Sequence, residues 1–134
     1  MNPLTTIVAP ATPAVPADTA PGARPAGGSF EALFRPRSVA VIGASRERGT
    51  IGAEIFHNLI SHGFEGVVYP VNPKANVVQS VQAYPSIEAV PGPVDLAMIV
   101  VPAAAVLGVL DACGRAGVRA AVVISAGFAE TGEE

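Results

Sequence analysis

The chain has 134 residues, enough for one domain, and a formal net charge of −3. This acidic balance argues against an electrostatic nucleic-acid surface, although a few local Arg and Lys residues suffice for a small anionic ligand. A single cysteine, Cys113, cannot form an internal disulfide, and the apolar stretches fall short of the ~20 residues of a membrane span. We therefore expect a cytoplasmic protein that binds neither nucleic acid nor membranes.

The first 28 residues are rich in Pro, Ala, Thr and Gly and carry too little apolar area to offset the entropy of ordering. They therefore predict a disordered tail. A signal peptide is not indicated, because no basic residue precedes an apolar run. The folded domain is predicted to span residues 29–134. It opens with a short helix over 30–34, which Ser29 caps and Pro36 stops.

Four compact apolar runs, rich in Val, Ile and Ala, follow this helix. They predict buried parallel strands over residues 38–42, 66–71, 95–101 and 118–125. Helices are predicted between them over 50–62 and 103–116, each closed by a glycine. This alternation predicts an α/β fold, a Rossmann-like parallel sheet with helices on both faces.

Two parts of the chain fit this scheme less regularly. Between residues 76 and 91 we expect a turn, a short extended piece near 81–83 and a helical turn over 86–90. The sequence ends just after the fourth strand, before the helix and fifth strand that such a domain normally adds. We therefore expect a truncated fold, incomplete at its C-terminus, with an uncovered sheet edge or face and marginal stability or self-association.

The loops that follow the strands should carry the site, since right-handed crossovers place them all on one edge of the sheet. The first strand runs into Gly43, and the next helix opens at 49–52, so free N–H groups and the helix dipole would face a diphosphate. The glycine spacing departs from G-x-G-x-x-G, and an ordinary strand–helix connection with surface arginines is the alternative. The residues predicted to hold the diphosphate are Gly43, Ala44, Ser45, Arg46, Arg48, Gly49 and Thr50.

The second loop bears on which nucleotide binds. A NAD-binding fold carries an Asp or Glu at the end of its second strand for the ribose 2′-hydroxyl, and this sequence has none. Lys74 would instead suit an extra phosphate on the adenosine ribose, which both NADP and coenzyme A carry. A plain solvated lysine is the alternative.

Several separated motifs occur in a recognisable order. They are FRPRSVAVIGAS at 34–45, VNPK at 71–74, YPS at 84–86, VDLA at 94–97, VPA at 101–103 and SAGFAE at 125–130. Together they resemble the N-terminal CoA-binding domain of ADP-forming acyl-CoA (acetate–CoA) synthetases, which is similar to the start of the succinyl-CoA synthetase alpha subunit. The same domain is found in the synthetase-like part of bacterial protein lysine acetyltransferases. The resemblance covers nearly all of residues 29–134.

The resemblance implies coenzyme A or acyl-CoA as the ligand and assigns individual residues to it. Residues 45–48 would contact phosphate, and Lys74 would meet the phosphoadenosine end. Ala126 departs from the succinyl-type enzymes, which have a glutamate there. The crevice and the pantetheine arm would be bordered by Val101, Pro102, Ile124, Ser125 and Ala126.

The chemistry that the resemblance implies lies outside this chain, in a phosphohistidine domain and an ATP-grasp domain or subunit. His57 and His62 fall on the first long helix, and Cys113 falls in a small-residue helix, where structural roles are expected. No catalytic residue and no metal-ligand spacing is predicted.

The predicted function is a CoA-binding module of an ADP-forming acyl-CoA synthetase, not catalytic by itself, whose parent ligase acts on acetate or another small acid. One alternative is the acyl-CoA-sensing part of a protein lysine acetyltransferase, and another is a stand-alone CoA-binding protein. An NADP-dependent oxidoreductase or redox-sensing regulator is less favoured, because of the irregular glycine spacing and the loop at Pro102.

Overall fold

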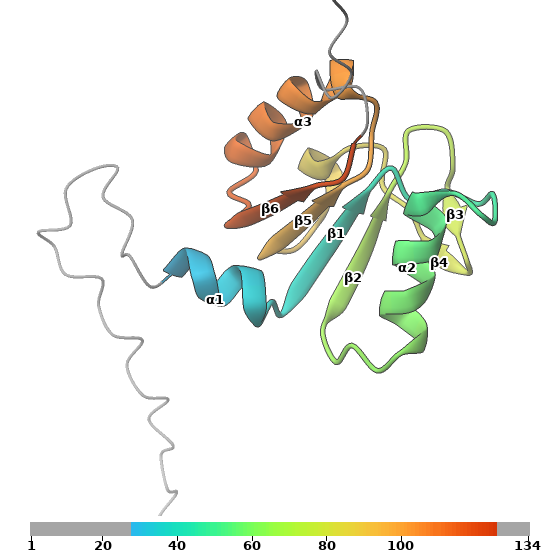
Figure 1. Cartoon of the computed structure of the whole chain (residues 1–134), viewed down its shortest axis with the longest axis horizontal. Helices are drawn as coiled ribbons and strands as arrows, with labels where there is room; N and C mark the ends of the chain where they lie inside the picture. Colours follow the sequence, from blue (N-terminus) through green and yellow to red (C-terminus); the bar gives the residue numbers. More distant parts are fainter. Residues whose placement is uncertain (1–27, 126–134) are drawn as a thin grey trace, which may run out of the picture.

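A computed structural model describes residues 28–125, and their side chains from residue 30 onward. Four parallel strands form its main sheet, in the spatial order β2-β1-β5-β6 (Figure 1). They are β1 (Ser38–Ile42), β2 (Val67–Val71), β5 (Leu96–Ile99) and β6 (Ala120–Val123). The predicted tail, apart from Gly28, lies outside the described residues.

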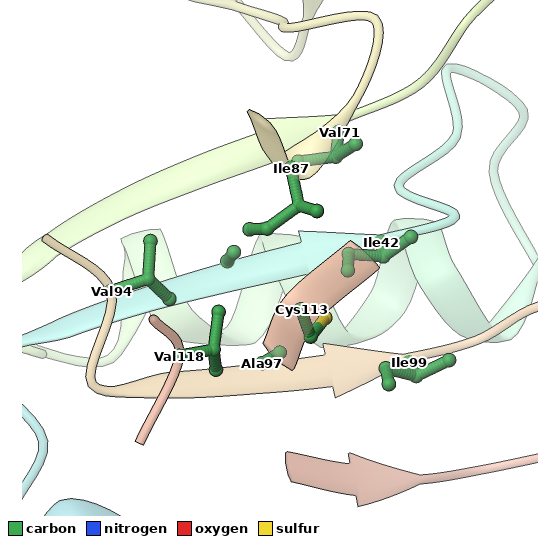
Figure 2. Close-up of a cluster of buried hydrophobic side chains, with 9 residues drawn as sticks. Ile42, Val71, Ile87, Val94, Ala97, Ile99, Cys113 and Val118 are labelled. Atoms are coloured by element: carbon green, nitrogen blue, oxygen red, sulfur yellow. The ribbon is translucent and has the colours of Figure 1, made fainter. Parts of the chain in front are cut away.

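Helices cover both faces of this sheet, as the sequence predicts (Figure 1). Helix α2 (Ile51–Ser61) packs Phe56 against Val39 and Val41 of β1 on one face. Helix α3 (Ala103–Arg115) packs Cys113 against Ala97 and other residues of β1 and β5 on the opposite face (Figure 2). All five residues of β1 are buried because this strand lies between two others and under both helices.

Strand β6 is shorter than the predicted span 118–125. Val118 donates its N–H to Cys113 O at 3.0 Å and is buried in the cluster under α3, so regular pairing begins only at Ala120. Exposure alternates along β6, because helix α1 (Gly28–Phe34) contacts one of its faces, whereas Val123 on the other face is 38% exposed. Helix α1 begins at Gly28, so Ser29 lies within the helix rather than capping it from outside.

A small antiparallel hairpin lies where only a turn and a short extended piece were predicted. It joins β3 (Val77–Val78) to β4 (Val81–Gln82) through Gln79 and Ser80, which have φ of 48° and 68°. The turn lacks the Asn-Gly or Asp-Gly signature of such hairpins. A tertiary contact holds it instead, since Gln79 Nε2 donates to Ala53 O at 2.9 Å and Gln79 Oε1 lies 3.2 Å from His57 Nδ1.

The remaining segments close the two ends of the sheet. After the hairpin, Tyr84 pairs in parallel with the end of β2, and the expected helical turn is a 3-10 turn, η1 (Ile87–Ala89). At the amino edge, the Asp95 carboxylate accepts the Arg37 N–H at 2.9 Å and lies 3.7 Å from the Arg119 guanidinium. No helix in the described part of the chain combines the length and the apolar character needed to cross a bilayer.

Candidate functional site

The carboxyl ends of β1 and β5 form a topological switch point. From β1 the chain leaves through residues 43–50 to α2 on one face, whereas from β5 it leaves through residues 100–102 to α3 on the other. Gly43 and Val101, one from each connection, line the same crevice at this point, which is where doubly wound sheets bind ligands. The sequence prediction that the strand-end loops share one edge is confirmed by the parallel pairing of all four strands.

Gly43 is the tightest point of this crevice. It has φ of +96°, and a Cβ added there would lie 1.9 Å from Val100 O. A Cβ at Gly52, on the first turn of α2, would lie 2.0 Å from Gly43 O. Because backbone atoms come this close at both positions, only glycine fits at either one. The loop therefore starts in direct contact with the backbone that follows β5.

The loop after Gly43 is held by its own hydroxyl groups. Ser45 Oγ accepts the Glu47 N–H at 3.0 Å. Thr50 Oγ1 donates to Glu47 O at 2.9 Å and accepts the Ala53 N–H at 3.3 Å, which makes Thr50 the N-cap of α2. Two of the residues predicted to contact phosphate therefore shape the loop and fix the start of the helix.

Arg46 and Arg48 point to the α2 side of the crevice. Both are exposed, and both line a hollow of about 440 Å³ between α2 and the hairpin tip, together with His57, Gln79 and Ser80. No ion pair within residues 30–125 involves either arginine. This polar hollow, which Glu54 also lines, thus holds two arginines that no ion pair engages, beside the start of α2.

An apolar cavity of about 330 Å³ lies on the α3 side. Its walls combine strand ends with the small-residue side of α3, and they include Ile42, Val71, Val101, Ala105, Gly108 and Ala112. Figure 2 shows Ile42, Val71 and Ile87, which also lines the cavity, in the same buried cluster as Cys113. The volume is at the lower end of the range for small-molecule pockets.

Asn72 connects the first two loops. Its Nδ2 donates to Ala44 O at 2.7 Å, and its Oδ1 accepts the Lys74 N–H at 2.7 Å. The backbone of Lys74 is therefore held next to the β1 loop, while its side chain is exposed. Pro73, between Asn72 and Lys74, lines the apolar cavity, so Lys74 is the next residue in the chain after a residue of the cavity wall.

The predicted pantetheine border lies at the ends of β5 and β6. Pro102 is the N-cap residue of α3, and Ser125 Oγ donates to Val101 O at 2.6 Å. Ile124 donates its N–H to Ile99 O at 2.8 Å, which extends the β5–β6 pairing. Ala126 lies outside the described residues.

The predicted residues therefore divide between two sides of the crevice. Gly43 and Val101 line the apolar cavity, whereas Arg46 and Arg48 line the polar hollow. Gly49 is exposed with φ of +87°, and Ala44 is fully buried with its carbonyl on Asn72. Sequence reasoning missed Asn72 and the small side of α3, although Ala105, Gly108 and Ala112 recur at helical spacing.

The remaining reactive side chains have structural surroundings. Cys113 is buried in the cluster under α3, and this burial raises the pKa of its thiol. His57 contacts Gln79 and Ser61, and His62 Nδ1 lies 3.2 Å from Asn58 O. Within residues 30–125, no group of three or more His, Cys, Asp or Glu side chains could hold a metal ion.

The topology and the strand-end crevice define the class of the protein: it is a Rossmann-like α/β domain with a ligand crevice at its switch point. A model of the CoA binding domain matches residues 37–133. This chain belongs to that CoA-binding family.

Curated relatives and solved structures agree with this assignment. The chain is 50% identical over 110 residues to the alpha subunit of ADP-forming acetate–CoA ligase I from Pyrococcus furiosus, covering 79% of this chain and 24% of that subunit. It is 43% identical over 102 residues to an ADP-forming 4-hydroxybutyrate–CoA ligase from Nitrosopumilus maritimus, covering 76% of this chain and 14% of that ligase.

A solved acetyl-coenzyme A synthetase 1 of Ca. Korarchaeum cryptofilum, described as dinucleotide forming and in complex with phosphate and ADP, is similar with a TM-score of 0.74 and 50% identity. The match covers 80% of this chain and 23% of that one. The chain thus spans about a quarter of the length of the first of these relatives.

Proposed function

We propose that this chain is the CoA-binding part of an ADP-forming acyl-CoA synthetase of the acetate–CoA ligase type. The observation that carries the proposal is the pairing of an apolar cavity with unpaired cations at one switch point, within a chain of the CoA-binding family. Coenzyme A has the matching parts: a purine ring, a diphosphate and a ribose 3′-phosphate.

Each part of the ligand has a suitable region in the crevice. The diphosphate would lie on loop 43–50, where Arg46, Arg48 and the start of α2 supply positive charge. The adenine ring would enter the apolar cavity, and the 3′-phosphate would meet Lys74 at its wall. The pantetheine arm would run toward Val101 and Pro102, past the end of β6.

The end of β2 favours coenzyme A over NAD. Val71 is followed by Asn72, Pro73 and Lys74, so no carboxylate is available for a ribose 2′-hydroxyl. The Asn72 side chain is already committed to Ala44 and Lys74, which leaves the exposed lysine as the charged group on this loop. A cation there suits a phosphorylated ribose.

The acyl transfer itself would belong to other domains. A phosphohistidine domain and an ATP-grasp domain or subunit are the partners that we propose, with acetate or another small acid as the acyl donor. This chain's share is to hold the CoA. The single cysteine fits a reducing compartment, and we propose the cytoplasm.

A titration of the chain with CoA, acetyl-CoA, NADP and NAD tests the proposal. A ligand at 100 times its Kd should stabilise the fold by about 2.7 kcal/mol, and thermal unfolding detects such a shift. We expect CoA and acetyl-CoA to raise the Tm and NAD to leave it unchanged. Stabilisation by NADP without stabilisation by CoA would contradict the proposal.

A lysine variant tests the position of the ribose phosphate. Lys74 is the only lysine of the chain, and Lys74→Ala should weaken CoA binding about tenfold while leaving 3′-dephospho-CoA binding nearly unchanged. Arg35→Ala is the matched control, since Arg35 is an exposed cation near the opposite edge of the sheet. Equal losses for both ligands would mean that Lys74 does not meet the 3′-phosphate.

A further inference from the structure

Glu54 is an acid in direct contact with the phosphate loop. It lies in the first turn of α2, and its Oε1 accepts the Gly49 N–H at 3.2 Å. Its side chain is exposed and lines the same polar hollow as Arg46 and Arg48. The carboxylate therefore occupies an amide that the loop would otherwise offer to an anion.

The hollow contains opposite charges that do not neutralise one another by contact. Among the described residues, no ion pair joins Glu54 to Arg46 or Arg48 within 4.0 Å. The carboxylate is held by a backbone amide and by the favourable field at the start of a helix. A phosphate that reaches the arginines must therefore share the hollow with a negative charge.

We propose that Glu54 sets the affinity of loop 43–50 for anions, as a resident acceptor that a phosphate-bearing ligand must displace. This inference rests on the proposed function, because the anion in question is the diphosphate of CoA. Glu54 has two opposing effects: its hydrogen bond orders the loop, and its charge repels the ligand. The charge outweighs the hydrogen bond, since Gly49 is exposed and water can replace the acceptor.

The variant Glu54→Gln separates the two effects, because its amide oxygen can still accept the Gly49 N–H while the charge is lost. We expect this variant to bind CoA roughly threefold to tenfold more tightly than the wild type at low salt. The gain should shrink as salt is raised, and binding of pantetheine, which has no phosphate, should not change. Glu54→Ala, which loses the hydrogen bond as well, should gain less.

Two matched variants remove the same charge elsewhere. Glu47 lies within the loop, but its carboxylate makes no hydrogen bond or ion pair among the described residues, and Glu65 is exposed just before β2 at the opposite edge. Glu47→Gln should tighten CoA binding less than Glu54→Gln does, and Glu65→Gln should leave it unchanged. Calorimetric titration measures all of these affinities.

The outcomes separate this inference from the proposed function. A wild-type chain that binds neither CoA nor inorganic pyrophosphate overturns both. CoA binding that is unchanged or weakened in Glu54→Gln, or tightened equally in Glu47→Gln, overturns the role of Glu54 alone. If Glu54→Gln does not fold, the salt-dependent gain in Glu54→Ala decides the question in the same way.

Discussion

The two faces of the sheet are filled in different ways. On the α2 face, Phe56 is completely buried between the helix and Val39 and Val41, and the hollow nearby is polar. On the α3 face the helix contributes Cys113, a smaller side chain than Phe56, to the buried cluster. Ala105, Gly108 and Ala112 line an apolar cavity there. The Phe56 ring fills the α2 face, whereas on the α3 face an apolar cavity remains at the strand ends.

The two faces therefore offer a ligand at the switch point different surroundings, one charged and one apolar. Arg46 and Arg48 lie on the face that Phe56 fills, beside a loop that hydroxyl groups hold. The apolar cavity lies on the other face, where the helix carries small residues. A ligand with a charged end and a flat apolar end could bridge the two faces across Gly43. Substitutions on each face should therefore affect stability and binding in different proportions.

The largest effect is expected at Phe56. Truncation to Ala would remove a fully buried ring and leave a cavity, at a cost of about 3–5 kcal/mol in the free energy of unfolding. Cys113→Ala, on the α3 face, removes one sulfur atom and should cost about 1 kcal/mol. Urea denaturation of both variants measures the contrast, and equal costs would break the comparison.

The second effect concerns Gly43, which directly follows β1, the strand that both helices cover. Gly43→Ala would place a Cβ on the Val100 carbonyl in a left-handed conformation, so a loss of about 3 kcal/mol or more is expected. Gly49→Ala is the control, because its φ is also positive, at +87°, but the space around its Cβ is open. That variant should lose only about 1–2 kcal/mol, which reports backbone strain without the clash.

The third effect should change binding more than stability. Gly108→Leu would fill the apolar cavity from α3, where a Cβ meets no neighbour within 4 Å, and leucine favours a helix by about 1 kcal/mol over glycine. We expect a raised Tm and a CoA affinity at least about tenfold lower. Gly114→Leu shares the helix and the open surroundings but does not line the cavity, so its Tm should rise without loss of affinity.

The smallest effect lies at the edge away from the crevice. The Asp95 side chain is 16% exposed, accepts the Arg37 N–H and lies near the Arg119 guanidinium. Asp95→Asn should lower the free energy of unfolding by about 1 kcal/mol and leave CoA affinity unchanged. An affinity loss in this variant would show that the two edges of the sheet are coupled.

The elements of the fold were largely readable from the sequence. The run Ser38–Ile42 is buried throughout and was predicted with its observed bounds, because a central parallel strand needs a continuous apolar run. At the hairpin around Gln79 and Ser80 only a turn and an extended piece were predicted, since the hairpin depends on contacts with Ala53 and His57 that no local pattern encodes. Tertiary contacts overrode turn propensity there.

The candidate site was readable in outline only. Glycines after a strand and before a helix predicted the position of loop 43–50 at the strand ends, because few other residues permit such close backbone approach; its role as a phosphate site stays a prediction. The separation of cations and apolar volume onto opposite faces was not predictable, since it depends on which way each connection leaves the sheet. Likewise, the contact of Glu54 with Gly49 requires the loop to fold back onto α2.

The bridge from Asn72 to Ala44 makes the crevice depend on two strands at once. These loops are 28 positions apart in the chain, so neither is in place until β1 and β2 have docked. A local opening that frees the end of β2 also breaks the hydrogen bond from Asn72 N–H to Tyr84 O, and the two loops then lose the arrangement that forms the crevice. Bound ligand must therefore slow deuterium uptake at the amide of Asn72, while amides of α1, far from the crevice, continue to exchange at their unliganded rate.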